Sequence, residues 1–477
     1  MRLLLNQTPI EVANPSADVT LLQWLRECQY LTATKEGCAV GDCGACTVMI
    51  GRLVNDGIVY QSVNACIALL GSLNACHVVT LDGLQAEPLH PVQQAMVDCH
   101  ASQCGFCSPG FVMSLLVWWL NTPVQELTTP ADFASHRHGV ELALSGNLCR
   151  CTGYQPILLA ADQLAPVDRS TDPLFSALGG YSYCLDTLRA MSTEQHHGRL
   201  NAYQRPQDLN QLALAYAAMP EARLVAGATD LALDITQGLK SFEHLIDIKS
   251  VAQLQAIDEH SGGLTIGAAV SLSQLETYCQ AKLPCMTALL GRFASRQVRN
   301  RGTLVGNIAN SSPIADTPPL LLVLDAQLIL QRGQNQRTLA LADFYLDYKK
   351  TALEAGEFIH SVILPLPTVP QQVFVEKVSK RAEDDISSTC VALSVTLNNG
   401  VIAQINIACG GMAAIPKMAS HTQSQLLGQA IDPSLLAQVP QWLAQDYHPI
   451  DDMRASADYR QQVTANLIVG FLKQAMA

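Results

Sequence analysis

Two groups of cysteines in the first third of the chain have spacings that could bind metal. The first group is Cys38, Cys43 and Cys46, in the pattern C-x4-C-x2-C, with Cys66 further on. In plant-type [2Fe–2S] sites one tight loop supplies three thiolates and a separate segment supplies the fourth. The interspersed glycines suit such a loop, because they let the backbone curl closely. A structural zinc site is the competing interpretation, although zinc sites usually present paired C-x2-C knuckles.

The second group combines a C-x2-C pair with a C-x-C pair: Cys104, Cys107, Cys149 and Cys151. A helix is predicted to begin directly after each pair, at Ser108 and at Gln155. Helix N-termini stabilise anionic thiolates and the negative charge of a cluster. Chemistry alone therefore favours a second [2Fe–2S] cluster and leaves zinc open.

The two cysteine groups also carry a family resemblance. In this order, EGCAVGDCGACTV, NAC, QCGFCSPGF and LCRCTGYQPI strongly resemble the iron–sulfur region of the molybdenum hydroxylases, the xanthine dehydrogenase and aldehyde oxidase family. The resemblance implies that each group of four cysteines binds its own [2Fe–2S] cluster. It also implies that Gln103 lies against a molybdenum pterin cofactor, with a polar helix-cap residue as the alternative. The stretch around NTPVQELTTPADFASHRHG is longer than usual in the family, and we expect a surface loop there.

Further along, ARLVAGATDLAL indicates a β-strand that runs into a turn of small residues and then a helix. The consecutive N–H groups of such a turn can bind a pyrophosphate. By itself this signal is weak, because the turn is not G-x-G-x-x-G. A second segment, NRGTLVGNIANSSPIADTPPLLLVLDA, contains small polar residues that would line a cavity better than a core.

Together, LVAGATDL and FASRQVRNRGTLVGNIANSSPIAD resemble the flavin domain of the same family, which is similar to the vanillyl-alcohol-oxidase (PCMH-type) FAD fold. The resemblance covers roughly residues 200–415. Residues 224–230 would then hold the FAD pyrophosphate, and Phe293 would approach the isoalloxazine. The implied FAD-binding residues are Leu224, Val225, Ala226, Gly227, Ala228, Thr229, Asp230, Phe293, Thr303, Gly306, Asn307, Asp316, Ile359 and Lys377.

An acidic stretch, VEKVSKRAEDDISSTC, resembles the segment that shapes the nicotinamide side of the flavin. On this resemblance Asp384 and Tyr348 are candidates for NAD binding. A solvated acidic turn is the alternative interpretation.

These motifs imply an α+β multidomain fold. We expect a β-grasp plant-type ferredoxin domain (1–82), a helical [2Fe–2S] domain (83–165), a linker (166–198), a PCMH-type FAD domain (199–370) and a C-terminal α+β flavin subdomain (371–477). The linker is predicted from Pro166, Pro173, the Gly179-Gly180 pair and the polar run STEQHHG. His196 and His197 have no partner at metal spacing and are expected to be solvated.

Composition excludes several function classes. The 477 residues carry 29 Lys and Arg against 41 Asp and Glu, a net charge of −12, with no dense basic run, so a nucleic-acid partner is not expected. The apolar stretch 111–120 is about half of a membrane span and no signal peptide is visible, which predicts a soluble, cytoplasmic chain without a membrane partner. The cysteines outside the two groups are expected to be small buried side chains.

The resemblance implies an electron-transfer subunit with no catalytic residue of its own. No stretch resembles a molybdopterin-binding region, so we expect hypoxanthine and xanthine to be oxidised to urate on a separate large subunit. On the same resemblance, electrons would pass from molybdenum to the second cluster, the first cluster, FAD and NAD. Flavin can join one-electron clusters to NAD because it exchanges electrons singly or as a hydride. A dimer of heterodimers is the expected assembly. Alternatives are the reductase subunit of an aldehyde or N-heterocycle hydroxylase, a stand-alone NADH diaphorase and a zinc-stabilised scaffold.

Overall fold

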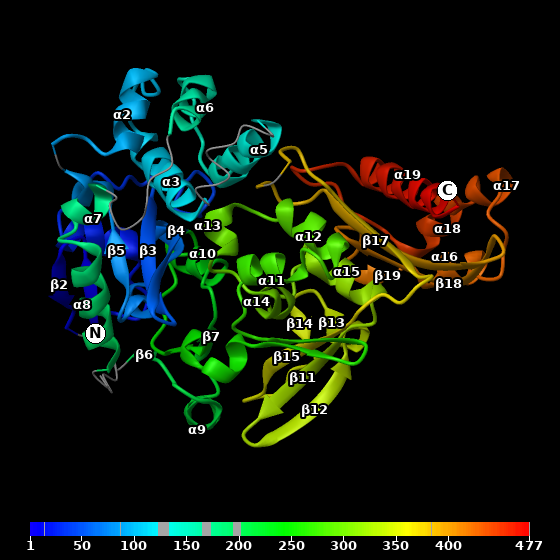
Figure 1. Cartoon of the computed structure of the whole chain (residues 1–477). Coiled ribbons are helices and arrows are strands. Elements are labelled where there is room, and N and C mark those ends of the chain that lie inside the picture. The colour runs from blue at the N-terminus through cyan, green and yellow to red at the C-terminus, as the bar shows by residue number, and fades with distance from the viewer. Residues whose placement is uncertain are drawn as a thin grey trace. The chain divides into compact units, whose positions relative to one another are not determined.

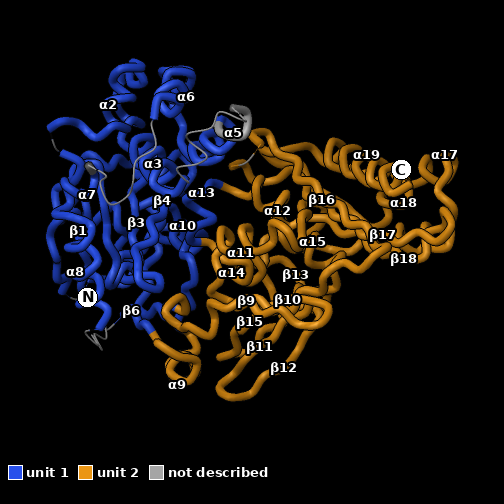
Figure 2. Tube along the Cα trace, viewed as in Figure 1, with its two compact units in different colours: residues 1–205, 222–247, 295–301 blue, residues 206–221, 248–294, 302–477 orange. Residues whose placement is uncertain are grey.

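Figure 1 presents the computed structural model of the chain, which describes residues 1–13, 15–85, 87–122, 133–164, 173–193, 202–382 and 384–476. Two compact units are present (Figure 2). Unit 1 comprises residues 1–205, 222–247 and 295–301, and unit 2 comprises residues 206–221, 248–294 and 302–477. Unit 1 therefore includes two short segments that are distant from the rest of it in sequence.

A five-stranded mixed sheet forms the N-terminal part of unit 1. Its order is β2 (Thr8–Glu11), β1 (Arg2–Leu5), β5 (His77–Val79), β3 (Thr47–Val54), β4 (Gly57–Asn64). β1 and β5 are parallel, and the other neighbours are antiparallel. Side chains alternate between two cores: Leu3 and Leu5 pack on one face with the short helix α1 (Leu21–Gln23), and Leu4 packs on the other. This arrangement confirms the predicted β-grasp domain.

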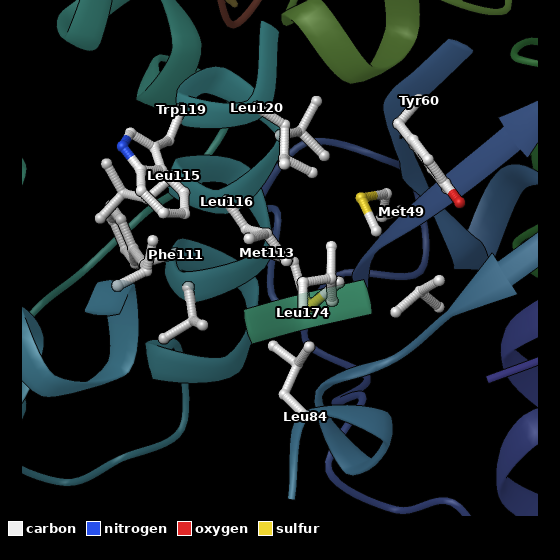
Figure 3. Packing of buried hydrophobic residues seen from close by; sticks show 14 of the residues in the cluster. Met49, Tyr60, Leu84, Phe111, Met113, Leu115, Leu116, Trp119, Leu120 and Leu174 are labelled. Atoms are coloured by element: carbon white, nitrogen blue, oxygen red, sulfur yellow. The ribbon is translucent and has the colours of Figure 1, made fainter. Parts of the chain in front are cut away.

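The other face of the sheet is covered by the helix α3 (Ser108–Asn121). The helices α2 (Pro91–Asp98) and α5 (Phe133–Leu144) pack on α3, and α6 (Gln155–Asp162) packs on α2 and α5. α3 lies against β3 and β4 and is apolar on nearly all sides, so it forms the centre of the core in Figure 3, where Phe111, Leu115 and Trp119 pack among neighbouring side chains. The helix starts predicted at Ser108 and Gln155 are confirmed.

Two predictions on this region involve residues that the structure does not describe. Residues 123–132 of the expected surface loop, and both His196 and His197, lie outside the described residues. The end of the expected loop is helical, because α5 begins at Phe133.

The segment predicted as a linker, 166–198, is helical over much of its described part. It contains α7 (Pro173–Ala177) and α8 (Tyr181–Thr193). Gly179 and Gly180, with φ of 86° and 101°, turn the chain between these helices, so the Pro and Gly signals mark helix ends. Phe175 and Leu188 are buried in the same core as α3. The expectation of a plain linker is therefore corrected here: the segment completes the iron–sulfur domains.

Unit 1 also contains a small parallel sheet, ordered β6 (Tyr203–Gln204), β8 (Leu245–Asp247), β7 (Arg223–Val225). The helix α10 (Leu231–Thr236) follows β7, and α13 (Arg296–Arg299) comes from the distant segment Ser295–Arg301. Tyr203 and Val225 pack with Leu69 of the ferredoxin part. The strand-turn-helix unit around residues 224–230 is present as expected.

Unit 2 combines two antiparallel sheets. The first is ordered β12 (Asn335–Ala340), β11 (Gln327–Arg332), β15 (Phe358–Pro365), β10 (Gly263–Gly267), β9 (Ile257–His260). Associated elements are α9 (Leu209–Ala218), α11 (Leu272–Cys279), α12 (Pro284–Gly291), α14 (Leu304–Ala309), α15 (Thr317–Val323) and the hairpin β13 (Tyr345–Asp347) and β14 (Lys350–Thr351).

The second sheet is ordered β16 (Gln372–Val378), β17 (Thr389–Asn398), β18 (Val401–Gly410), β19 (Lys417–Met418). It forms a core with the C-terminal helices α16 (Ser420–Leu426), α17 (Pro433–Leu436), α18 (Val439–Asp446) and α19 (Ala457–Ala475). The expected strands followed by a helical end are confirmed. Within the described part of the chain, no helix combines the length and apolarity that a membrane crossing requires.

Leu188 tests the structural role of α8. Its side chain is fully buried, so Leu188→Ala should lower the free energy of unfolding by about 2–5 kcal/mol. The measurement is urea denaturation, compared with Leu239→Ala, which removes a leucine that is 86% exposed. Equal stability of the two variants would show that α8 does not belong to the core.

Candidate functional site

The first cysteine group gathers where β3 and β4 meet the preceding loop. The strand register pairs Thr47 with Asn64, so the flanking Cys46 and Cys66 come together from opposite strands. Cys38 and Cys46 raise the pKa of Cys66, and Cys43 lowers that of Cys38, so the four thiols lie within interaction distance of their neighbours. Cys46 and Cys66 are buried, and the other two thiols are half-buried. The predicted ligand set is thus brought together in space.

Hydrogen bonds give Cys38 an environment that suits a thiolate, whereas neighbouring thiols and burial raise the pKa of Cys43 and Cys66. The side chains of Cys43 and Cys66 hold the pKa of Cys38 far below its usual value. The N–H groups of Val40 and Cys43 also donate to Cys38 Sγ, at 3.5 and 3.3 Å. Because thiolate is the form that binds metal, these donors favour ligation.

The loop accommodates no side chain at two of its glycines. A Cβ at Gly37 would lie 2.7 Å from Cys43 Sγ, and one at Gly44 would lie 2.2 Å from the carbonyl oxygen of Gly146. Gly44 also has φ of +68°, which disfavours other residues. The close wrapping that an iron–sulfur cluster requires is therefore built into the backbone.

The second cysteine group is arranged as two cross pairs. The thiols of Cys104 and Cys151 shift each other's pKa, and so do those of Cys107 and Cys149. Burial and a hydrogen bond to Cys149 raise the pKa of Cys107 to about 12. The N–H of Thr152 donates to Cys149 Sγ at 3.4 Å. Cys107 is also the N-cap of the fourteen-residue helix α3, whose N-terminal dipole opposes this rise in pKa.

Across the described residues, no three or more His, Cys, Asp or Glu side chains are placed to hold one metal ion. A [2Fe–2S] cluster divides its four thiolates between two irons. Such a cluster therefore needs four neighbouring cysteine side chains rather than one three-ligand site, and each group supplies four. The residues present fit two clusters.

The two groups differ in exposure. Cys104 and Cys151 are exposed, as are Gln103 and Phe106 beside them, whereas Cys46 and Cys66 in the first group are buried. One edge of the second group thus faces outward from unit 1. The predicted contact of Gln103 with a pterin on another chain stays a prediction.

A buried polar cluster that sequence reasoning missed connects the two cysteine groups. The N–H of Leu148 donates to the carbonyl of Cys43 at 3.0 Å. The amide of Asn147, only 3% exposed, donates to the carbonyl of Gly44 at 3.1 Å and accepts from Ser114 Oγ at 2.7 Å and Gln297 Nε2 at 3.0 Å. The position of Asn147, two residues before Cys149, was the available sequence signal.

The turn predicted to hold the FAD pyrophosphate lies in unit 1. Leu224 and Val225 end β7, and the turn 226–230 leads into the six-residue helix α10. The carbonyl of Gly227 accepts from Arg301 Nε at 3.1 Å. Among the hydrogen bonds of the described residues, none has the N–H of residues 227–230 as its donor. The turn therefore has donors to offer an anion, which fits a pyrophosphate.

The other predicted flavin residues belong to unit 2. Thr303 caps α14, because its hydroxyl accepts from the N–H of Gly306 at 2.9 Å. Asn307 Oδ1 accepts from Thr317, the neighbour of Asp316, at 2.6 Å. These contacts bring the residues of α14 and the start of α15 together.

Asp316 and Lys377 form a buried ion pair with a separation of 3.1 Å, and Ser387 donates to the same carboxylate. Buried charges are tolerated when they are paired and hydrogen-bonded. Lys377 lies on β16, and α12, which ends just before Phe293, packs against that strand. Ile359 lies on β15, and α14 packs against that strand. Six of the predicted residues, with Phe293 next to α12, thus come from adjoining elements.

The candidate NAD residues also lie in unit 2. Tyr348, 62% exposed, lies at the tip of the β13–β14 hairpin, and Lys349 Nζ ties this hairpin to Asn310 at the end of α14. Asp384 is half-buried, and its neighbour Asp385 accepts from Arg381 Nε at 2.7 Å. NAD binding at these residues stays a prediction.

A matched pair of cysteine variants tests the first group. Cys66→Ser should lower the iron content from about four to about two per chain and remove one electron paramagnetic resonance signal, because one ligand set loses a thiolate. Cys76→Ser is the control, since both side chains are 1% exposed but Cys76 lies outside the group. Full iron in Cys66→Ser would contradict the assignment.

Four family models match the chain. They are described as a 2Fe-2S iron-sulfur cluster binding domain (residues 3–70), a [2Fe-2S] binding domain (80–162), an FAD binding domain in molybdopterin dehydrogenase (195–367) and a CO dehydrogenase flavoprotein C-terminal domain (375–475). The two cysteine groups fall inside the two iron–sulfur matches. The predicted flavin residues fall inside the FAD-binding match, except Lys377, which falls inside the flavoprotein C-terminal match.

Curated relatives include xanthine dehydrogenase of Drosophila subobscura, 31% identical over 92% of this chain, and that of Emericella nidulans, 30% identical over 94%. The chain spans 36% of the length of each.

Similar solved structures are CO dehydrogenase from Oligotropha carboxidovorans and quinoline 2-oxidoreductase from Pseudomonas putida 86, both 26% identical. The TM-scores are 0.54 and 0.53, respectively. The matches cover 56% and 58% of this chain, and 95% and 98% of the two solved chains. With both iron–sulfur domains and both flavin domains matched in order, the chain belongs to the molybdenum hydroxylase family of xanthine dehydrogenase and its relatives.

Proposed function

We propose that the chain is the electron-transfer subunit of a xanthine dehydrogenase, which carries electrons from a purine oxidised on a separate molybdopterin subunit to NAD. The observation that carries this proposal is the placement of both cysteine groups in unit 1, joined by the hydrogen bond from Leu148 to the carbonyl of Cys43. Two one-electron centres that share one rigid frame form a relay.

The bound groups supply the redox chemistry: a [2Fe–2S] cluster carries single electrons, and flavin exchanges either one electron or a hydride. The protein supplies binding and insulation. Buried Cys46 and Cys66 keep water from the first site, and the N–H donors to Cys38 stabilise thiolate charge. Residues 227–230 offer N–H groups to the FAD pyrophosphate.

The exposure of Cys104 and Cys151 supports a partner subunit on that side. An electron donor on another chain needs a short approach to one site, and the second group provides an outward edge. Similar structures are described as a Cu,Mo-CO dehydrogenase and as a CO dehydrogenase that lacks part of its molybdenum cofactor. We therefore assign the molybdopterin centre to a large partner subunit, in a dimer of heterodimers.

The purine substrate and the NAD acceptor rest on the relatives that bear the name xanthine dehydrogenase, and on the hairpin that carries Tyr348. A second candidate function is the corresponding subunit of an N-heterocycle hydroxylase. The similarity to quinoline 2-oxidoreductase favours it. The two candidates share every site in this chain and differ in the partner's substrate.

An anaerobic NADH titration of the purified chain tests the relay. Two one-electron clusters and a two-electron flavin should take up about four electrons per chain, with bleaching of both the iron–sulfur and the flavin absorbance. Iron and flavin are quantified on the same sample, so that incomplete loading is corrected.

Well-loaded protein that dithionite reduces but NADH does not would overturn NAD as the acceptor. Uptake of about two electrons, with the iron–sulfur bands unchanged, would contradict a connected relay.

A further inference from the structure

We propose that Arg301 is a positioning residue that orients the backbone of residues 227–230 for the FAD pyrophosphate. This inference rests on the proposed function, because it assumes that this turn binds FAD. Arg301 itself is placed behind the turn and acts through its backbone.

The contact with Gly227 determines which way the turn presents its donors. Arg301 Nε donates to the carbonyl oxygen of Gly227 at 3.1 Å. In a planar trans peptide the C=O and the following N–H point in opposite directions. Anchoring this carbonyl on Arg301 therefore directs the N–H of Ala228 away from the arginine. Ala228 adopts φ of +64°, a conformation that a non-glycine residue keeps only when its surroundings enforce it.

Arg301 is itself held rigidly. Its side chain is buried, and its second nitrogen, NH2, donates to Ser72 Oγ at 2.9 Å. Ser72 belongs to a 3₁₀ turn (Leu70–Leu73) of the ferredoxin domain. That turn packs closely on the small parallel sheet, since a Cβ at Gly71 would lie 2.6 Å from the ring of Tyr203. The guanidinium thus joins the pyrophosphate turn to the domain of the first cysteine group.

The charge of Arg301 adds to this geometry. Burial lowers its pKa and the nearby Arg52 opposes its charge, while Tyr203 and Asp247 favour the charged form. Asp247 in turn accepts from the hydroxyl of Tyr203 at 2.9 Å. A buried cation behind a row of N–H groups strengthens the positive field that an anionic pyrophosphate meets.

A lysine cannot replace this arginine. The planar guanidinium donates in two fixed directions, to Gly227 and to Ser72, whereas an ammonium is a single point donor on a flexible stem. Arg301→Lys therefore keeps the charge and loses the simultaneous contacts. Arg52→Lys is a matched control, because Arg52 donates to the carbonyl of the same Ser72, and no hydrogen bond given for the described residues joins Arg52 to the turn.

The experiment measures FAD affinity of the full chain after reversible removal of flavin, with both iron–sulfur signals recorded by electron paramagnetic resonance. We expect Arg301→Lys to weaken FAD binding about 10-fold or more, since a hydrogen bond from a charged group is lost. Arg52→Lys should bind FAD as the wild type does, and both cluster signals should remain in each variant.

A second variant covers the case in which Arg301→Lys does not fold. Ser72→Ala removes one anchor of the guanidinium and should weaken FAD binding about 3-fold or more, with both cluster signals intact. Wild-type affinity in Arg301→Lys, or in Ser72→Ala when the first variant is unfolded, would overturn the inference. An equal loss in Arg52→Lys would also overturn it, because the effect would then be general loosening. Wild-type protein that binds no FAD would instead refute the proposed function.

Discussion

The hydrogen bonds of the Asn147 amide hold the centre of unit 1 together. Its nitrogen donates to Gly44 in the loop of the first cysteine group, and its oxygen accepts from Ser114 on α3 and from Gln297 of a distant segment. A buried amide without partners is costly, so this site stabilises only the arrangement in which all of these elements are in place. The spacing of the two cysteine groups depends on that requirement.

The two groups occupy different environments because different elements supply them. A strand pair buries Cys46 and Cys66 at the base of the β-grasp sheet. The second group lies on loops before α3 and α6, where only Cys149 is buried. The first group is thus an inner site shielded from water, and the second has an outward edge, which is the difference on which the proposed entry of electrons at the second group rests.

The segment Ser295–Arg301 belongs to unit 1, although its neighbours in sequence on both sides belong to unit 2. Gln297 and Arg301 place buried polar side chains in the iron–sulfur part, while Phe293 and Thr303, just outside the segment, belong to unit 2. The segment is therefore a short covalent connection between the unit that carries the cysteines and the one that carries most predicted flavin residues. α7 and α8 contribute to the same unit by completing its core.

Sequence alone determined the features that depend on local spacing. The cysteine motifs, the helix starts at Ser108 and Gln155 and the small-residue turn at 226–230 are all read within short windows, because ligand spacing, capping and turn chemistry are local properties. The α+β fold class followed from the same motifs.

Tertiary structure decided the rest. The helices between Pro173 and Thr193 were hidden by their Pro and Gly boundaries, and only their burial in the core that also contains α3 reveals their role. Asn147 and Arg301 each have a hydrogen-bond partner more than 70 residues away in the sequence, Gln297 and Gly227. At such separations no local sequence pattern indicates which polar groups meet. Burial then decides the outcome, because a polar side chain inside the protein must find whichever partner the fold brings to it.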